Sequence, residues 1–253
     1  IDAVNHGHIF RYLTKPVSIP QMIEVLDSAI ECYLRARQGD HAEQLTRDAF
    51  VQWGRDLGRA IELDQLFLVY QPQIDLVSGD LKGFEALIRW NHPKHGLVPP
   101  AEFIPTAEIT GTIIPITEWA LKTACRQISA LRKVSPGIKV AVNISAAHHQ
   151  PLNLIEIVQS AFDETGIEPR QTELEITETV VVENMATLGQ VLKSLDALGV
   201  GIALDDFGSG YMNFSYLREL PVKKLKIDKS FVSCVLTDDK CAAIVHSLVT
   251  VGR

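Results

Sequence analysis

Alternating apolar and polar positions mark a series of strands from residue 67 onward, because side chains on a strand face opposite sides in turn. The predicted strands are 67–75, 82–90, 139–145, 172–178, 201–206 and 222–228. Apolar residues at every third or fourth position predict helices near 115–134, 151–165, 184–198 and 239–251. The turn sequence Ser-Gly-Asp predicts an antiparallel first hairpin, and the intervening helices predict parallel later strands. This pattern indicates an α/β barrel.

Polar side chains gather on one face of these strands. In the third strand Val140, Val142 and Ile144 alternate with Asn143 and Ser145, and the other strands show the same separation. The polar residues expected on the inner face are Glu85, Arg89, Asn143, Ser145, Glu175, Asp205, Lys226 and Asp228. They lie near strand ends, where barrels of this type carry their chemistry.

Several of these groups are hard oxygen donors that would repel one another without a cation. Glu85, Asn143, Glu175 and Asp205 suit Mg²⁺ or Mn²⁺ rather than zinc. Asp206 could bridge to a second cation, and such a pair is the usual clamp for attack on a phosphodiester.

The ordinary alternatives for the same residues remain open. An acidic pair before a glycine is also typical of a solvated strand end or a helix N-cap, and Lys226 could extend to solvent. We expect His92 and His95 to be loop residues rather than ligands.

Composition narrows the class of protein. The chain has 253 residues, 46% of them hydrophobic, and a formal charge of −7. It contains no apolar run long enough for a membrane span, so we expect a cytoplasmic protein with no membrane contact. The negative charge argues against DNA binding, and an acidic substrate would need a cation. The cysteines, without CxxC spacing, are predicted to be buried free thiols rather than disulfides: Cys32, Cys125, Cys234 and Cys241.

Five ordered motifs then resemble a known family. They are "EAL" at Glu85–Leu87, "NIS" at Asn143, "EITE" at Glu175–Glu178, "DDFGSGY" at Asp205–Tyr211 and "KIDKSF" at Lys226–Phe231. They resemble the motifs of EAL domains over roughly residues 57–253. The resemblance implies a cyclic di-GMP phosphodiesterase with an α/β fold, a (β/α)8 barrel whose first strand is antiparallel. Such an enzyme opens the ring to linear pGpG.

The resemblance also implies roles for individual residues. Glu85, Asn143, Glu175 and Asp205 would be ligands of the first metal, and Asp206 the ligand of the second. Lys226 would contact the attacking water or the phosphate. Glu178 would steady the loop after "DDFG", which is tied to dimerisation in the family and so implies a homodimer. The substrate-binding residues would be Gln71, Arg89, Leu87 and Asp228.

The N-terminal segment resembles the end of a response-regulator receiver domain. Residues 1–38 would be its last strand and helix, with Lys15 as the invariant lysine and Tyr12 as the aromatic switch residue. Residues 39–56 would form a linker helix. The implied partner is a histidine kinase whose signal regulates the barrel. An unrelated strand and helix packed on the barrel is the alternative.

The family pattern continues beyond this sequence with a further glutamate motif and a "QG" motif, and six strands are predicted where a closed barrel needs eight. We therefore expect a sequence cut at both ends. The absent glutamate leaves a second hypothesis beside the enzyme: a receptor that binds cyclic di-GMP without hydrolysing it.

Overall fold

The computed structural model describes residues 53–131, 137–145, 151–208 and 214–252. The receiver-like segment, with Tyr12 and Lys15, lies outside these residues, as does nearly all of the predicted linker helix. Those two expectations therefore stay predictions.

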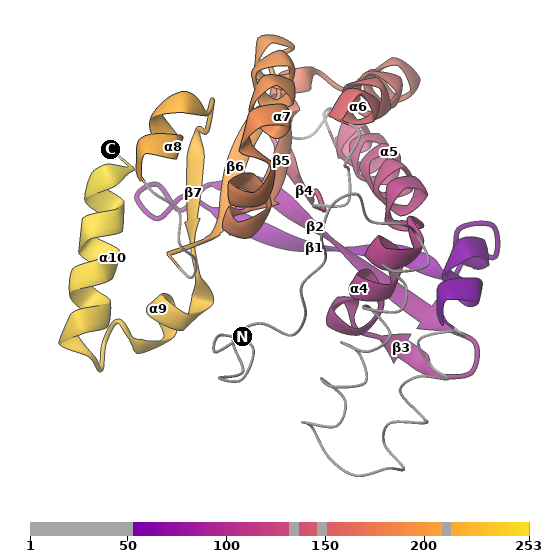
Figure 1. Cartoon of the computed structure of the whole chain (residues 1–253), viewed down its shortest axis with the longest axis horizontal. Helices are drawn as coiled ribbons and strands as arrows, with labels where there is room; N and C mark the ends of the chain where they lie inside the picture. The colour runs from indigo at the N-terminus through magenta and orange to yellow at the C-terminus, as the bar shows by residue number, and fades with distance from the viewer. Residues whose placement is uncertain (1–52, 132–136, 146–150, 209–213, 253) are drawn as a thin grey trace, which may run out of the picture. The chain divides into compact units, whose positions relative to one another are not determined.

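A mostly parallel sheet forms the centre of the described domain (Figure 1). Its strands, in spatial order, are β1 (Leu66–Ile74), β2 (Leu81–His92), β4 (Lys139–Asn143), β5 (Thr172–Thr177), β6 (Gly201–Phe207) and β7 (Lys224–Ile227). The short strand β3 (Gly96–Val98) pairs with β2 off this path. β1 runs antiparallel to β2, and β2 and β4–β7 pair in parallel. The predicted barrel with an antiparallel first strand is confirmed.

The sheet curves strongly enough to bring its two outer strands together. Lys224 on β7 donates a hydrogen bond of 3.1 Å to Gln73 Oε1 on β1, although these strands are not neighbours in the sheet. Such a contact requires that the inner faces of both strands line the same barrel interior. Side chains far apart in sequence can therefore meet there.

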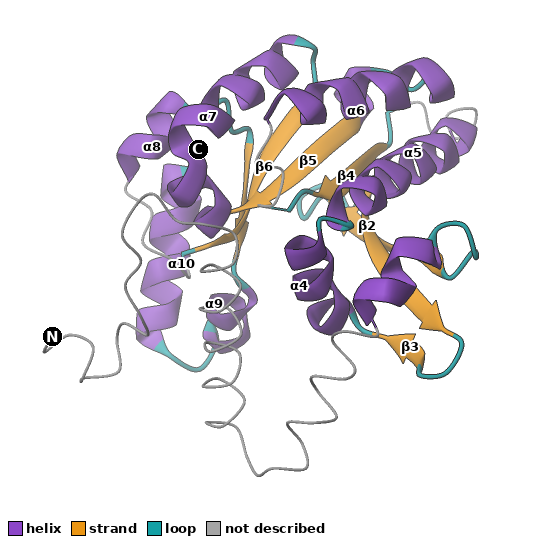
Figure 2. Ribbon diagram, turned by 45° about the vertical axis from the view of Figure 1, so that its right-hand side comes forward, coloured by secondary structure: helices purple, strands orange, loops and turns teal. Residues whose placement is uncertain are grey.

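Helices flank the sheet (Figure 2). They are α4 (Pro100–Thr110), α5 (Ile113–Leu131), α6 (Pro151–Thr165), α7 (Glu178–Ala197), α8 (Phe214–Glu219), α9 (Lys229–Cys234) and α10 (Asp239–Val251). Figure 2 shows α5, α6 and α7 along β4, β5 and β6. The core between them contains Val140, Val142, Leu174 and Ile176, all nearly inaccessible to solvent. None of the helices in the described ranges is long and apolar enough to cross a membrane.

The long elements were predictable and the short ones were not. All six strands and four helices of the sequence pattern are present, with α7 beginning at Glu178 rather than near residue 184. The prediction missed β3, α8 and α9, which are too short to show a period. It also missed α4, because Pro100 and Pro105 read as helix breakers although Pro100 opens the helix.

The expectation that every cysteine is a free thiol was wrong. Cys234 and Cys241 form a disulfide bond between the end of α9 and the start of α10. Their separation of seven residues gave no sign of it, because the turn that brings them together joins two helices, one of which was not predicted. Cys125 is a buried free thiol, as expected, and burial raises its pKa to about 11.

Candidate functional site

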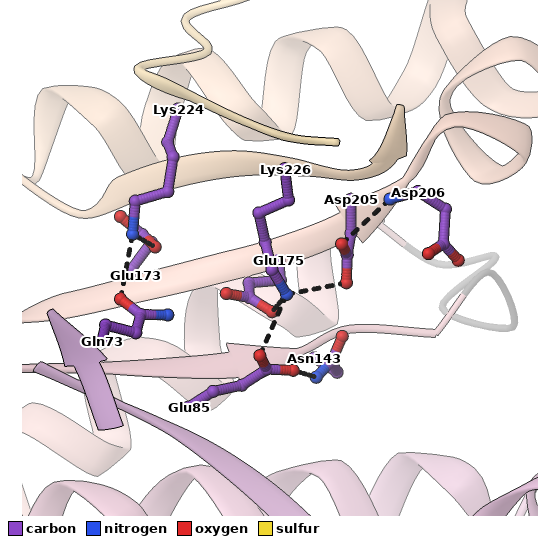
Figure 3. Close-up of polar contacts among 9 residues, drawn as sticks. All are labelled: Gln73, Glu85, Asn143, Glu173, Glu175, Asp205, Asp206, Lys224 and Lys226. Carbon is purple, nitrogen blue, oxygen red and sulfur yellow. Dashed lines mark hydrogen bonds and ion pairs between the residues drawn. The ribbon is translucent and has the colours of Figure 1, made fainter. Parts of the chain in front are cut away.

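Lys226 lies at the centre of an acidic cluster inside the barrel (Figure 3). Its Nζ donates to Glu85 Oε2 at 3.1 Å, to Asp205 Oδ2 at 2.9 Å, and also to Glu175 Oε2. These four residues come from β7, β2, β6 and β5. The expected alternation of faces is thus observed, and Lys226 does not extend to solvent.

Asn143 joins the cluster from β4. Its Nδ2 donates to Glu85 Oε1 at 3.0 Å, and it stands beside Glu175 in the register of β4 and β5. The aliphatic neighbours of these residues, Val142 and Leu174, point the other way into the core. One apolar and polar alternation therefore builds both the core and the site.

The donor set fits a divalent cation. One carboxylate oxygen each of Glu85, Glu175 and Asp205 lies within 4.8 Å of the other two. Glu175 is 1% exposed, and its Oε1 is buried without a hydrogen-bond partner. A buried carboxylate oxygen normally has a partner, and a hard cation supplies one. The observation supports the predicted chemistry of the site and leaves the identity of the metal open to experiment.

Asp206 occupies a different position from Asp205. Its backbone N–H donates to Asp205 Oδ1 at 2.9 Å, and its φ of 52° is in the left-handed region. Figure 3 shows its carboxylate turned away from Lys226. Asp206 is therefore outside the three-carboxylate group, and its role as ligand of a second cation stays a prediction.

Burial and charge act on the protonation of the cluster. Burial raises the pKa of Glu175 to about 7, against the hydrogen bond from Lys226. Burial also acts to raise the pKa of Glu85, but Asn143 and Lys226 outweigh it and hold that pKa below its ordinary value. Although burial acts to lower the pKa of Lys226, its acidic partners raise it, so the ammonium stays charged. The pKa of Asp206 is raised, first by burial and then by Asp205 and Asp228.

The turn after the paired aspartates is held by Glu178, the first residue of α7. Its Oε2 accepts a 3.1 Å hydrogen bond from Gly208 N, and Glu178 is 3% exposed. Gly208 has a φ of 100°, and a Cβ there would lie 3.1 Å from the ring of Phe231. This backbone path accordingly requires glycine. The contact agrees with the steadying role that the resemblance implies for Glu178.

The expected substrate-binding residues surround the cluster. Gln71 is opposite Glu85 in the β1–β2 register, and Asp228 caps the start of α9 by accepting from Ser230 N at 2.8 Å. Leu87 and Arg89 line a cavity of about 270 Å³ that Asn143 also lines. Their roles in substrate binding stay predictions.

A second ion pair, which is partly exposed, was not predicted. Lys224 donates to Glu173 Oε1 at 2.5 Å and to Gln73, one layer away from the Lys226 cluster (Figure 3). Lys224 and Glu173 each precede a cluster residue by two positions, so strand parity placed them on the same inner face. That signal could have identified them.

His92 departs from its predicted place in a loop. It is the last residue of β2, is 2% exposed, and lies with its Nε2 3.0 Å from Asp56 Oδ2. Its Nδ1 accepts from the backbone N–H groups of Lys94 and His95. Both ring nitrogens thus have protein partners.

Comparison with known proteins identifies relatives. Residues 54–253 match the family described as "EAL domain". The "Bifunctional diguanylate cyclase/cyclic di-GMP phosphodiesterase MucR" of Pseudomonas aeruginosa is 39% identical over 223 residues, which are 88% of this chain and 32% of that protein. A "Cyclic di-GMP phosphodiesterase" of the same species is 36% identical over 215 residues, 85% of this chain and 36% of that protein.

A solved structure shares the fold. It is described as "PaMucR Phosphodiesterase, c-di-GMP complex", has a TM-score of 0.75 and is 41% identical, covering 80% of this chain and 82% of that one. The chain spans about a third of the length of the two curated relatives, at 32% and 36%. The similarity therefore concerns one domain of those proteins.

Proposed function

Because the chain belongs to the EAL domain family, we propose that it hydrolyses cyclic di-GMP to linear pGpG with two divalent cations, Mg²⁺ or Mn²⁺. Relatives that are 39% and 36% identical carry cyclic di-GMP phosphodiesterase in their names. A solved relative with a TM-score of 0.75 is a complex with the same dinucleotide.

The observation that carries the proposal is the convergence of Glu85, Glu175 and Asp205 around Lys226. A cluster with three carboxylates and one ammonium keeps an excess of negative charge, which favours cation binding in a protein whose substrate is itself anionic. A site that bound the dinucleotide through direct contacts alone would have no need of this excess.

Each residue has a distinct part in the proposal. Glu85, Asn143, Glu175 and Asp205 would hold the first cation, and Asp206 the second. When bound, the cations supply the positive charge that activates water and neutralises the phosphodiester oxygens. Lys226 stays protonated, so it would donate to the attacking water or to a phosphate oxygen rather than accept a proton.

The remaining residues would position the substrate and the loop. Arg89 would make a charge-assisted hydrogen bond to phosphate, and Gln71, Leu87 and Asp228 would contact the dinucleotide. Glu178 would hold the turn at Gly208, through the 3.1 Å hydrogen bond already described. That turn directly follows the two aspartates.

The setting of the domain is part of the same proposal. The motif sequence around Tyr12 and Lys15 supports a receiver-type segment at 1–38 and a linker at 39–56 before the barrel. A histidine kinase would then regulate a cytoplasmic homodimer. Equal hydrolysis rates with and without a phosphoryl mimic would argue against this regulation.

The test is hydrolysis of cyclic di-GMP by the protein at its natural length, with Mg²⁺, Mn²⁺ or Ca²⁺, beside Asp205→Asn. We expect linear dinucleotide with Mg²⁺ or Mn²⁺ and its loss in the variant. Binding without hydrolysis under every cation would overturn the proposal and establish a receptor.

A further inference from the structure

The bridge between Cys234 and Cys241 is partly exposed and lies one short helix away from Asp228. Cys234 is the last residue of α9, Cys241 is the third residue of α10, and their Cα atoms are 5.9 Å apart. Both cysteines are partly exposed, whereas Cys125 is 0% exposed. Small thiols and disulfides can therefore reach this pair while Cys125 is shielded.

Helix α9 connects that bridge with the acidic cluster. It begins directly after Asp228, which caps it and stands next to the end of β7. In its middle Phe231 packs on Gly208, at 3.1 Å from the place where a Cβ would stand. Gly208 follows Asp206 by two positions, and the backbone N–H of Asp228 donates to the carbonyl of Phe207, the residue directly after Asp206, at 3.3 Å. The helix and its cap residue thus contact the segment that directly follows Asp206.

Few other contacts stabilise α9 within the part of the chain that the structure describes. It is six residues long, and none of its residues is buried. A helix of that length is marginal in water, so its order depends on contacts outside it. The neighbouring α10 is better anchored, because it has 13 residues and its Leu248 is 8% exposed. The disulfide therefore joins a short helix with no buried residue to a longer one that has a buried contact.

We propose that Cys234 and Cys241 form a redox modification site, at which reversible disulfide formation controls the order of α9 and with it the placement of Asp228 and Phe231 beside Asp206. The redox part stands on the positions of the two cysteines, and its effect on hydrolysis rests on the proposed function. Bridges that are exposed to solvent are typically the labile and regulatory ones.

The co-reactant is a low-molecular-weight disulfide such as glutathione disulfide. One cysteine thiolate attacks it, forming a mixed disulfide and releasing one thiolate; the second cysteine thiolate then attacks the protein sulfur and releases the other. The two cysteines lose two electrons and two protons in total, and the small disulfide is reduced to two thiols. Reduction reverses both exchanges.

The experiment compares the protein at its natural length after glutathione disulfide and after a phosphine reductant. Alkylation with mass spectrometry counts the free thiols, and hydrogen exchange reports the order of residues 229–241. We expect Cys234 and Cys241 to be protected together only in the oxidised sample, with roughly tenfold slower amide exchange across α9. Titration with Mn²⁺ should show weaker binding at one of two sites after reduction.

Two variants serve as controls. The double variant Cys234→Ser, Cys241→Ser should match the reduced protein under both treatments. Cys32→Ser and Cys125→Ser should each behave as wild type, which excludes the other cysteine pairs. Alkylation of both cysteines after oxidation, or equal exchange in the two redox states, would overturn the inference. Neither alkylation nor hydrogen exchange requires hydrolysis. If the order of α9 depends on the redox state but no hydrolysis occurs, only the proposed function is contradicted. If hydrolysis occurs and the order of α9 does not change, only this inference is contradicted.

Discussion

The carboxylate of Asp205 at the end of β6 lies 2.9 Å from the ammonium of Lys226 on β7. The same ammonium also contacts Glu85 and Glu175, so one positively charged group forms ion pairs with three carboxylates. A divalent cation among these carboxylates would take over part of that role. The stability of the protein without metal should therefore depend on Lys226 more than its stability with metal does.

Replacing Lys226 tests this relationship. In EDTA, Lys226→Met should lower the free energy of unfolding by about 3–5 kcal/mol, because buried carboxylates lose their partner. Added Mg²⁺ should raise the melting temperature of the variant more than that of wild type. Thermal unfolding with and without Mg²⁺ measures both effects.

Lys224→Met is the matched control. Lys224 also pairs with a buried carboxylate, that of Glu173, but one layer away from the cluster. This variant should lose stability and keep the wild-type response to Mg²⁺. Equal responses of the two lysine variants to Mg²⁺ would mean that the cation does not bind at Lys226.

The stability of the metal-free protein should fall as pH rises from 5 to 8. The pKa of Glu175 is raised from 4.5 to about 7 in the folded chain, first by burial. A raised pKa favours the protonated form in the fold, so this contribution is present below the unfolded value and is lost as pH passes the folded one. Chemical denaturation in EDTA across this range measures the slope.

Glu175→Gln should flatten that slope, because the amide does not titrate. The exposed Glu164 provides a control: its pKa is lowered, chiefly by Lys122, so its contribution changes only at lower pH. Glu164→Gln should keep the wild-type slope. An unchanged slope in Glu175→Gln would show that another group is responsible.

The turn at Gly208 should not accept a side chain. Gly208→Ala places a Cβ 3.1 Å from the ring of Phe231 at a φ of 100°, so we expect a loss of about 1–3 kcal/mol in the free energy of unfolding. Gly58→Ala, in a helix with open space around the position, should instead gain up to about 1 kcal/mol. Urea denaturation of both variants compares them, and similar losses would refute the steric argument.

Asp206→Asn should remove one cation site and leave the other. Asp206 lies outside the three-carboxylate group, and asparagine accepts its left-handed φ of 52°. Titration with Mn²⁺ followed by electron paramagnetic resonance should show two sites in wild type and one in the variant. Two sites in the variant would assign the second cation to other ligands.

The alternation of residues by itself determined the strand positions and the inner face that carries Glu85, Glu175 and Asp205. The helices between the later strands determined that these strands are parallel. These follow from local geometry, since strand parity and the length of crossovers are properties of neighbouring residues. The five motifs likewise identified the family without coordinates.

Tertiary structure alone decided the rest. That Lys226 contacts three carboxylates, and that Lys224 on β7 reaches Gln73 on β1, depends on how far the sheet curves. The bridge between Cys234 and Cys241 depends on the turn between two helices, which has no periodic signal. Periodicity states which face a side chain occupies, whereas the distance between faces is set by the packing of the whole chain.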